Sequence, residues 1–169
     1  TVAELLKGQG YATACIGKWH LGDQPEFLPR QQGFDYYFGL PYSNDMGPAE
    51  DGVKSNLGAP IPKRKGKGKG QPPLPLLRNE TVLQRVLAHD QTTLVARYTE
   101  EAVKFIRNSK AGPFFLNLWC YGVHGPWGHK EEYTRAFAIK KDRSGRQGNP
   151  IMASMLKSVD ECFGRILDE

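Results

Sequence analysis

Two short polar clusters in this sequence combine residue types that bind anions. They occupy residues 17–22 (GKWHLG) and 123–127 (VHGPW), and each comes after an apolar run typical of a buried strand, at residues 11–17 and 114–119. In open α/β sheets, ligands bind beyond the carboxyl ends of the strands. We therefore expect Lys18, His20 and His124 to face one site, where a lysine supplies a point charge and imidazoles donate hydrogen bonds or carry a proton.

The same residue types also have a purely structural interpretation. A single surface lysine is usually solvated, and a histidine after a strand often only hydrogen-bonds its own loop. The sequence contains neither a glycine-rich phosphate loop nor a serine nucleophile elbow. From spacing alone, the prediction is an anion site, with hydrolysis left open.

The first half of the chain is expected to begin with a helix and two strands. Residues 1–10 form an amphipathic pattern that Thr1 can cap, and residues 11–17 and 34–40 have the composition of strands, separated by a Gly/Pro-rich loop over residues 18–33. Residues 41–91 lack periodicity and contain most of the prolines, so we expect a long surface excursion over residues 49–91.

The second half of the chain alternates between helix and strand patterns. A helix is expected from Asp90 or Thr92 to about residue 108, followed by a strand at residues 114–119 that should be buried on both faces. Residues 128–149 are expected to form a second loop, and Pro150 to open a last helix. The expected buried stripe of that helix is Ile151, Met155, Val159, Phe163 and Ile166. This order of elements indicates an α/β layered fold.

Composition limits the classes of protein that this sequence fits. Its 169 residues suffice for one ordinary domain, and no apolar run approaches the ~20 residues of a membrane span. Both ends fall inside helical patterns, so we expect an internal stretch of a longer protein. Cys15, Cys120 and Cys162 lack metal-site or redox-motif spacing, and the first two are predicted to be buried structural thiols.

The net charge of +5 is concentrated in a Lys/Gly-rich run at residues 63–70. Such a run can bind nucleic acid or a sulfated polysaccharide. No aromatic residues are interleaved to stack bases, so we expect no nucleic-acid partner and interpret the run as a solvated loop.

The cluster at residues 17–22 resembles the second signature of the sulfatase family, and the resemblance continues along nearly the whole chain. Matching segments lie at 27–29 (FLP), 32–35 (QGFD), 38–48 (FGLPYSNDMGP), 74–77 (LPLL) with Asn79, 97–102 (RYTEEA), 113–116 (PFFL) and His124-x-Pro126. Residues 38–48 are similar to the arylsulfatase A subgroup in particular. Only the insertion at residues 63–71 lies outside the pattern.

This resemblance implies a fold and an activity. The fold would be an alkaline phosphatase/sulfatase-like mixed sheet flanked by helices, with residues 1–169 forming part of a single sulfatase catalytic domain. The activity would be hydrolysis of a sulfate monoester by a formylglycine nucleophile near a calcium ion. By position, Lys18 and His20 would be catalytic, and Lys18, Ser43 and His124 would bind substrate. Asn44 and Asp45 shape the pocket in this interpretation, or only form a turn.

The resemblance also implies what this stretch does not supply. No Cys-x-Pro-x-Arg segment occurs, since none of the three cysteines is followed by proline two residues later. We expect the formylglycine and the calcium ligands outside the chain, no metal ligand within it, and no activity from the isolated stretch. The implied partners are a sulfated small molecule or sulfated glycan and a formylglycine-generating maturation enzyme. The implied location is secreted, periplasmic or lysosomal.

Two alternatives remain open at this point. One is a phosphate-ester hydrolase of the same superfamily, which an upstream Thr or Ser nucleophile would indicate. The other is a non-catalytic polyanion-binding protein built around residues 63–69, whose binding would weaken steeply with salt.

Overall fold

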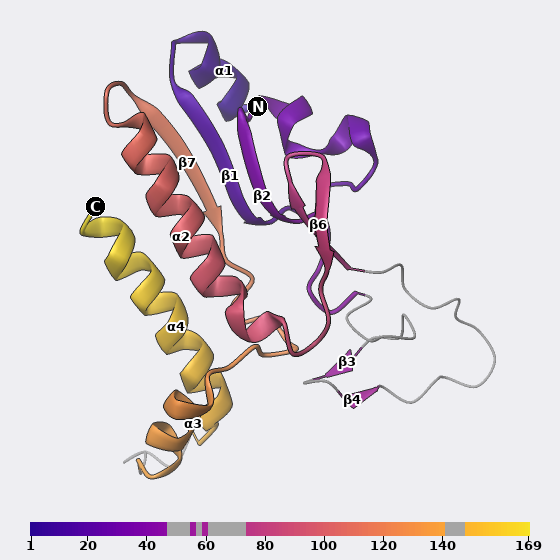
Figure 1. Ribbon diagram of the computed structural model, residues 1–169, viewed down its shortest axis with the longest axis vertical. Coiled ribbons are helices and arrows are strands. Elements are labelled where there is room, and N and C mark those ends of the chain that lie inside the picture. The colour runs from indigo at the N-terminus through magenta and orange to yellow at the C-terminus, as the bar shows by residue number, and fades with distance from the viewer. Residues whose placement is uncertain (47–54, 57–58, 61–73, 141–147) are drawn as a thin grey trace, which may run out of the picture.

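A mixed sheet flanked by helices on both faces forms the body of the computed structural model, which describes residues 1–46, 55–56, 59–60, 74–140 and 148–169 (Figure 1). Its five strands lie in the order β6-β5-β2-β1-β7. The predicted fold class is confirmed. The basic run at residues 63–70 lies outside the described residues.

Three parallel strands at one side of the sheet bring their carboxyl ends to one edge. β1 (Ala12–Lys18) lies between β2 (Tyr36–Leu40) and β7 (Phe114–Trp119). In the register, Lys18 pairs with Leu40 and Gly17 pairs with Trp119. The segments that follow these strands, which carry the predicted residues His20, Ser43 and His124, therefore start side by side.

Alternating side chains divide the core between the two faces of the sheet. Ile16, Phe38 and Leu76 belong to one apolar cluster with Leu94 and Tyr98 of α2 (Gln91–Ser109). Their sequence neighbours Cys15, Tyr37 and Leu77 belong to a second cluster with Ala3 of α1 (Val2–Gly8). The period of two in a strand sends successive residues to opposite faces, so α1 and α2 cover opposite faces.

Helices α1, α2 and α4 (Pro150–Leu167) begin where the sequence predicts them. Thr1 forms a capping box with Glu4 at the start of α1. In α4, Asn149 accepts hydrogen bonds from the backbone N–H groups of Ile151 and Met152, and Pro150 occupies the first turn. α4 packs on α2. Two 3-10 turns, Pro25–Phe27 and Pro29–Gln32, occupy the predicted loop after β1. No helix within the described ranges has the length and apolarity to cross a membrane.

The surface excursion expected over residues 49–91 does not extend to its carboxyl-terminal end, where the structure has two strands of the main sheet. β5 (Pro75–Arg78) and β6 (Thr81–Arg85) form a hairpin whose first strand pairs antiparallel with β2. These strands are short, β5 begins with a proline, and a register shift at Leu76/Leu77 interrupts the alternation, so no period of two was visible. A smaller pair, β3 (Ser55–Asn56) and β4 (Ala59–Pro60), also falls in this range.

Two expectations for the carboxyl-terminal half were wrong, and a third was right only in part. β7 is half-buried, not enclosed on both faces, because it lies at the sheet edge with β1 as its one described neighbour. α3 (Glu131–Ala138) occupies part of the expected second loop. Of the stripe expected on α4, Met155 is buried and Val159 and Ile166 pack against the core, whereas Phe163 is 46% exposed. Ser154, Ser158 and Cys162 complete the buried face of α4, and the apolar pattern did not mark them.

Candidate functional site

Close packing at the end of β1 positions Lys18. A Cβ atom on Gly17 would lie 2.0 Å from the carbonyl oxygen of Trp119, and Gly17 has a φ of +117°, so glycine lets β1 approach β7. Lys18 is partly buried and borders an open cavity of about 410 Å³, which Trp119, Cys120 and Gly122 also line. Lys18 thus borders a recess whose other lining is largely apolar.

Trp19 anchors the chain between Lys18 and His20. Its ring stacks on Trp119 at a centroid distance of 5.4 Å, and its Nε1 donates a hydrogen bond to the carbonyl of Phe27 at 2.9 Å. His20 is exposed and adopts a left-handed backbone with a φ of 57°. Its backbone N–H donates to the carbonyl of Pro41 at 3.0 Å. The segment carrying His20 therefore stays paired with the segment that leads from β2 to Ser43.

Ser43 is a buried hydroxyl at the start of a turn after β2. Its exposed fraction is 3%, and its Oγ has no hydrogen-bond partner among the residues that the structure describes. The carbonyl of Ser43 accepts a hydrogen bond from the N–H of Met46 at 2.9 Å, which closes the turn. A buried hydroxyl without a partner is costly unless a ligand or water satisfies it.

A buried amide pair joins the Ser43 turn to the loop that carries His124. The Nδ2 of Asn44 donates to the Oε1 of Gln91 at 3.1 Å and to the carbonyl of Pro126 at 3.3 Å, with a longer contact of 3.5 Å to the carbonyl of His124. In return, the Nε2 of Gln91 donates to the carbonyl of Asn44 at 2.7 Å. The hydroxyl of Tyr121 donates to the carbonyl of Gln91 at 2.8 Å. We call Asn44, Gln91 and Tyr121 the amide clamp.

His124 projects from the clamped loop toward solvent. Its Nδ1 lies 2.6 Å from the carbonyl of Gly125, which can only accept a hydrogen bond, so Nδ1 carries a proton. The exposed ring therefore presents Nε2 to a ligand, as an acceptor in the neutral form or a donor in the imidazolium.

The predicted site residues fall into two groups in the structure. Hydrogen bonds connect the His20 segment to Pro41 and the Ser43 turn to the His124 loop, while Lys18 borders the cavity on the β7 side. Sequence reasoning missed Gln91 and Tyr121 and ranked Asn44 low. Gln91 is the first residue of α2 and is 1% exposed. A polar residue at a helix start is usually solvated, so only its burial in the fold marks it.

The described residues do not fit a metal site. No group of three or more His, Cys, Asp or Glu side chains gathers within the described ranges. The candidate residues are lysine, histidine and serine, which donate hydrogen bonds to anions, whereas calcium prefers carboxylate and carbonyl oxygens. We derive no step through a metal from these residues.

Comparison with known proteins extends over the whole chain. The family model described as Sulfatase matches residues 1–169. Arylsulfatase G of Mus musculus is 32% identical over 179 residues, covering 100% of this chain and 32% of that protein. Arylsulfatase A of Homo sapiens is 35% identical over 171 residues, covering 99% of this chain and 31% of that protein. The chain thus spans about a third of the length of these relatives.

Solved structures share the fold. Ps i-CgsB in complex with k-i-k-neocarrahexaose gives a TM-score of 0.69 at 24% identity, over 99% of this chain and 35% of that chain. The PsFucS1 sulfatase from Pseudoalteromonas sp. gives a TM-score of 0.66 at 20% identity, over 99% and 34%. These likenesses agree with the sheet described above. Because the family model matches every residue, the chain belongs to the sulfatase family.

Proposed function

We propose that the protein hydrolyses sulfate monoesters, and that Lys18, His20, Ser43 and His124 form one wall of its active site. The observation that carries the proposal is the placement of these residues after three neighbouring parallel strands, at the edge where α/β sheets bind ligands. Family membership supports the sulfate ester as the substrate class.

Each residue has a role that its geometry favours. The ammonium group of Lys18 balances negative charge on the sulfate oxygens, and His20 holds and moves a proton next to the nucleophile. The unpartnered Oγ of Ser43 donates to a sulfate oxygen. The Nε2 of His124 donates to a sulfate oxygen near the leaving group when the ring is protonated, because Nδ1 is held by Gly125. Preorganised donors of this kind stabilise the charge that develops in the transition state.

The nucleophile and the metal belong to other parts of the protein in this proposal. Formylglycine, when present, supplies the hydroxyl that attacks sulfur, and calcium would be held near it. The three cysteines of this chain do not fit the nucleophile, since Cys15 and Cys162 are buried and none lies in a Cys-x-Pro-x-Arg segment. A maturation enzyme that makes formylglycine is therefore a required partner.

The names of two similar proteins indicate the general kind of substrate. One structural neighbour was solved with an oligosaccharide named k-i-k-neocarrahexaose, and one relative is named N-acetylgalactosamine-6-sulfatase. We propose a sulfated small molecule or a sulfated glycan as the substrate, and a secreted, periplasmic or lysosomal location.

The test is hydrolysis of an aryl sulfate by the protein encoded by the whole gene. Lys18→Ala and His124→Ala should each lower kcat/KM by about 10²-fold or more. Lys7→Ala and His89→Ala are matched controls, because Lys7 lies on α1 in an ion pair with Asp35 and His89 is an exposed side chain beside Asp90. Equal activity of all four variants would overturn the assignment.

An aryl phosphate assayed in parallel distinguishes the superfamily alternative. Faster hydrolysis of the phosphate than of the sulfate would replace the sulfatase proposal with a phosphate-ester hydrolase.

A further inference from the structure

Two cysteines from different elements meet beside the carboxyl end of the sheet. Cys120 directly follows β7, and Cys162 lies on the buried face of α4. Cys162 is 1% exposed within an apolar cluster, and Cys120 packs against that cluster. Each thiol shifts the pKa of the other, so the two side chains are neighbours.

The backbone around both cysteines is held closely enough to keep them together. A Cβ atom on Gly122 would lie 2.6 Å from Cε of Met155 and 2.9 Å from Cγ2 of Val159. Thus the chain just after Cys120 touches the turn of α4 that precedes Cys162. Cys120 also lines the 410 Å³ cavity together with Val159 and Phe163, which flank Cys162 on the helix.

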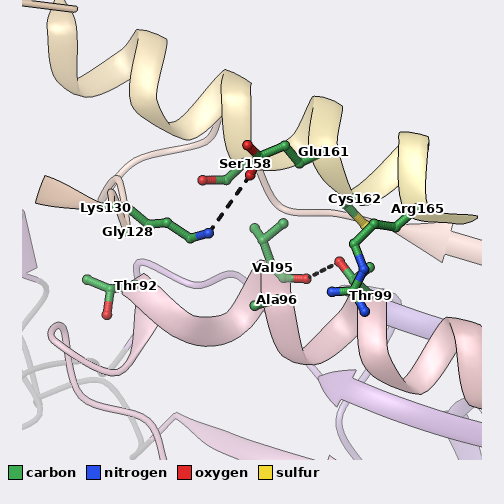
Figure 2. Close-up of a pocket in the computed structure, with 10 residues that line it drawn as sticks. All are labelled: Thr92, Val95, Ala96, Thr99, Gly128, Lys130, Ser158, Glu161, Cys162 and Arg165. Carbon is green, nitrogen blue, oxygen red and sulfur yellow. Dashed lines mark hydrogen bonds and ion pairs between the residues drawn. The ribbon is translucent and has the colours of Figure 1, made fainter. Parts of the chain in front are cut away.

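Cys162 faces the interior of the helix pair. Figure 2 shows it on α4, directed toward Thr99 of α2. This side chain lines a pocket of only about 50 Å³, whereas Cys120 borders the wide cavity. A small oxidant therefore reaches the pair from the Cys120 side.

We propose that Cys120 and Cys162 form a disulfide bond that ties the end of β7 to α4. The cross-link would join two side chains that pack in the same apolar cluster. This site is separate from the proposed hydrolysis and does not depend on it.

The chemistry is thiol–disulfide exchange with a small-molecule disulfide such as oxidised glutathione. One thiolate of the pair attacks a sulfur of oxidised glutathione, which forms a mixed disulfide and releases one glutathione thiolate. The second cysteine then attacks the mixed disulfide, forms the Sγ–Sγ bond and releases a second glutathione. Both cysteines are oxidised, the glutathione disulfide is reduced, and the two cysteine protons pass to the two glutathione thiolates.

The state of the pair favours this reaction. The hydrogen bond from the Cys120 thiol lowers the pKa of Cys162 to about 7, and the same bond raises the pKa of Cys120. The interaction between the thiols favours a pair that holds one thiolate and one thiol, and the thiolate is the reacting form. By contrast, burial raises the pKa of Cys15 to about 12, so Cys15 serves as an internal control.

The experiment treats the folded protein with oxidised glutathione and maps its peptides without reduction. We expect a peptide that joins Cys120 to Cys162, with Cys15 free. Because the bond closes a loop of about 40 residues that includes His124 and α3, oxidation should raise Tm by about 5–15 °C. Cys120→Ser should lose both the linked peptide and the rise in Tm, while Cys15→Ala should keep them.

Three outcomes would overturn the proposal. These are glutathione retained on Cys120 with Cys162 free, a cross-link between two copies of the chain, and a linked peptide that forms only in denaturant. The peptide map of the unsubstituted protein decides among them even if a variant fails to fold.

Discussion

At the scale of single residues, the amide clamp explains how two loops far apart in the sequence hold one site. The side chain of Asn44 donates to the side chain of Gln91, and the side chain of Gln91 donates to the backbone carbonyl of Asn44, at 0% and 1% exposure. Buried polar groups in such a pair are costly to leave unpaired and specify one arrangement when satisfied. The clamp therefore fixes the turn of Ser43 against the loop of His124.

The clamp predicts a measurable coupling between its members. Asn44→Ala and Gln91→Ala should each lower the free energy of unfolding by about 2–3 kcal/mol, because each leaves a buried partner unsatisfied. The double variant should cost less than the sum by about 1–2 kcal/mol. Urea unfolding of the four proteins measures this, with Gln24→Ala, at an exposed position, as a control. Strictly additive costs would contradict the coupling.

Asn79 has a structural role that its side-chain type makes possible. Its N–H donates to the carbonyl of Tyr37 at 2.8 Å, its Oδ1 accepts from the N–H of Tyr37 at 3.0 Å, and its φ is 55°. Asn79→Ala should lower the free energy of unfolding by about 2 kcal/mol, since it loses the acceptor and disfavours the left-handed backbone. Asn79→Asp keeps the acceptor and should cost less. The two thermal midpoints measure the difference, and equal midpoints would refute it.

At the scale of elements, the contact between β1 and β7 depends on one glycine. Gly17→Ala should lower the free energy of unfolding by about 3 kcal/mol or more, because its Cβ would meet the Trp119 carbonyl at 2.0 Å on a left-handed backbone. Gly8→Ala is the matched control, because nothing lies within 4 Å of a Cβ there. Chemical unfolding of both variants tests this, and similar midpoints would show that β1 and β7 can separate without cost.

The elements also show where sequence reasoning succeeds and where it fails. β1, β2, α2 and α4 have apolar runs or caps that mark them, and the sequence predicts each of them. β5 and β6 escaped because Pro75 and the shift at Leu76/Leu77 hide the alternation. α3 escaped because none of its residues is buried, so no apolar face signals a helix. The β5–β6 hairpin is therefore defined by its pairing in the sheet, and α3 is short and exposed, so neither has a local pattern that the sequence reveals.

At the scale of the whole molecule, the sequence located the candidate residues but not their supports. Lys18, His20, Ser43 and His124 come from a motif, and the parallel register of β1, β2 and β7 brings their segments to one edge. Gln91 and Tyr121 hold those segments from other elements, at sequence distances that no local pattern spans. The positions of such residues follow only from the assembled fold.

Ion pairs across the surface predict how the whole molecule responds to acid. Burial raises the pKa of Glu101. Hydrogen bonds from Tyr36 and Lys104 and the charge of Arg78 lower it by more than burial raises it, so the net shift of the pKa is downward. Hydrogen bonds from Arg107 and Lys110 lower the pKa of Glu169 to about 2. A carboxylate with a lowered folded pKa stabilises the fold above its unfolded pKa, and this stability is lost as pH falls through the folded pKa. The free energy of unfolding should therefore fall between about pH 5 and pH 2.

Glu101→Gln should flatten that fall, whereas Glu100→Gln, at the exposed neighbouring position, should leave it unchanged. Urea unfolding at a series of pH values measures both slopes, and identical slopes would show that the Glu101 contacts do not contribute.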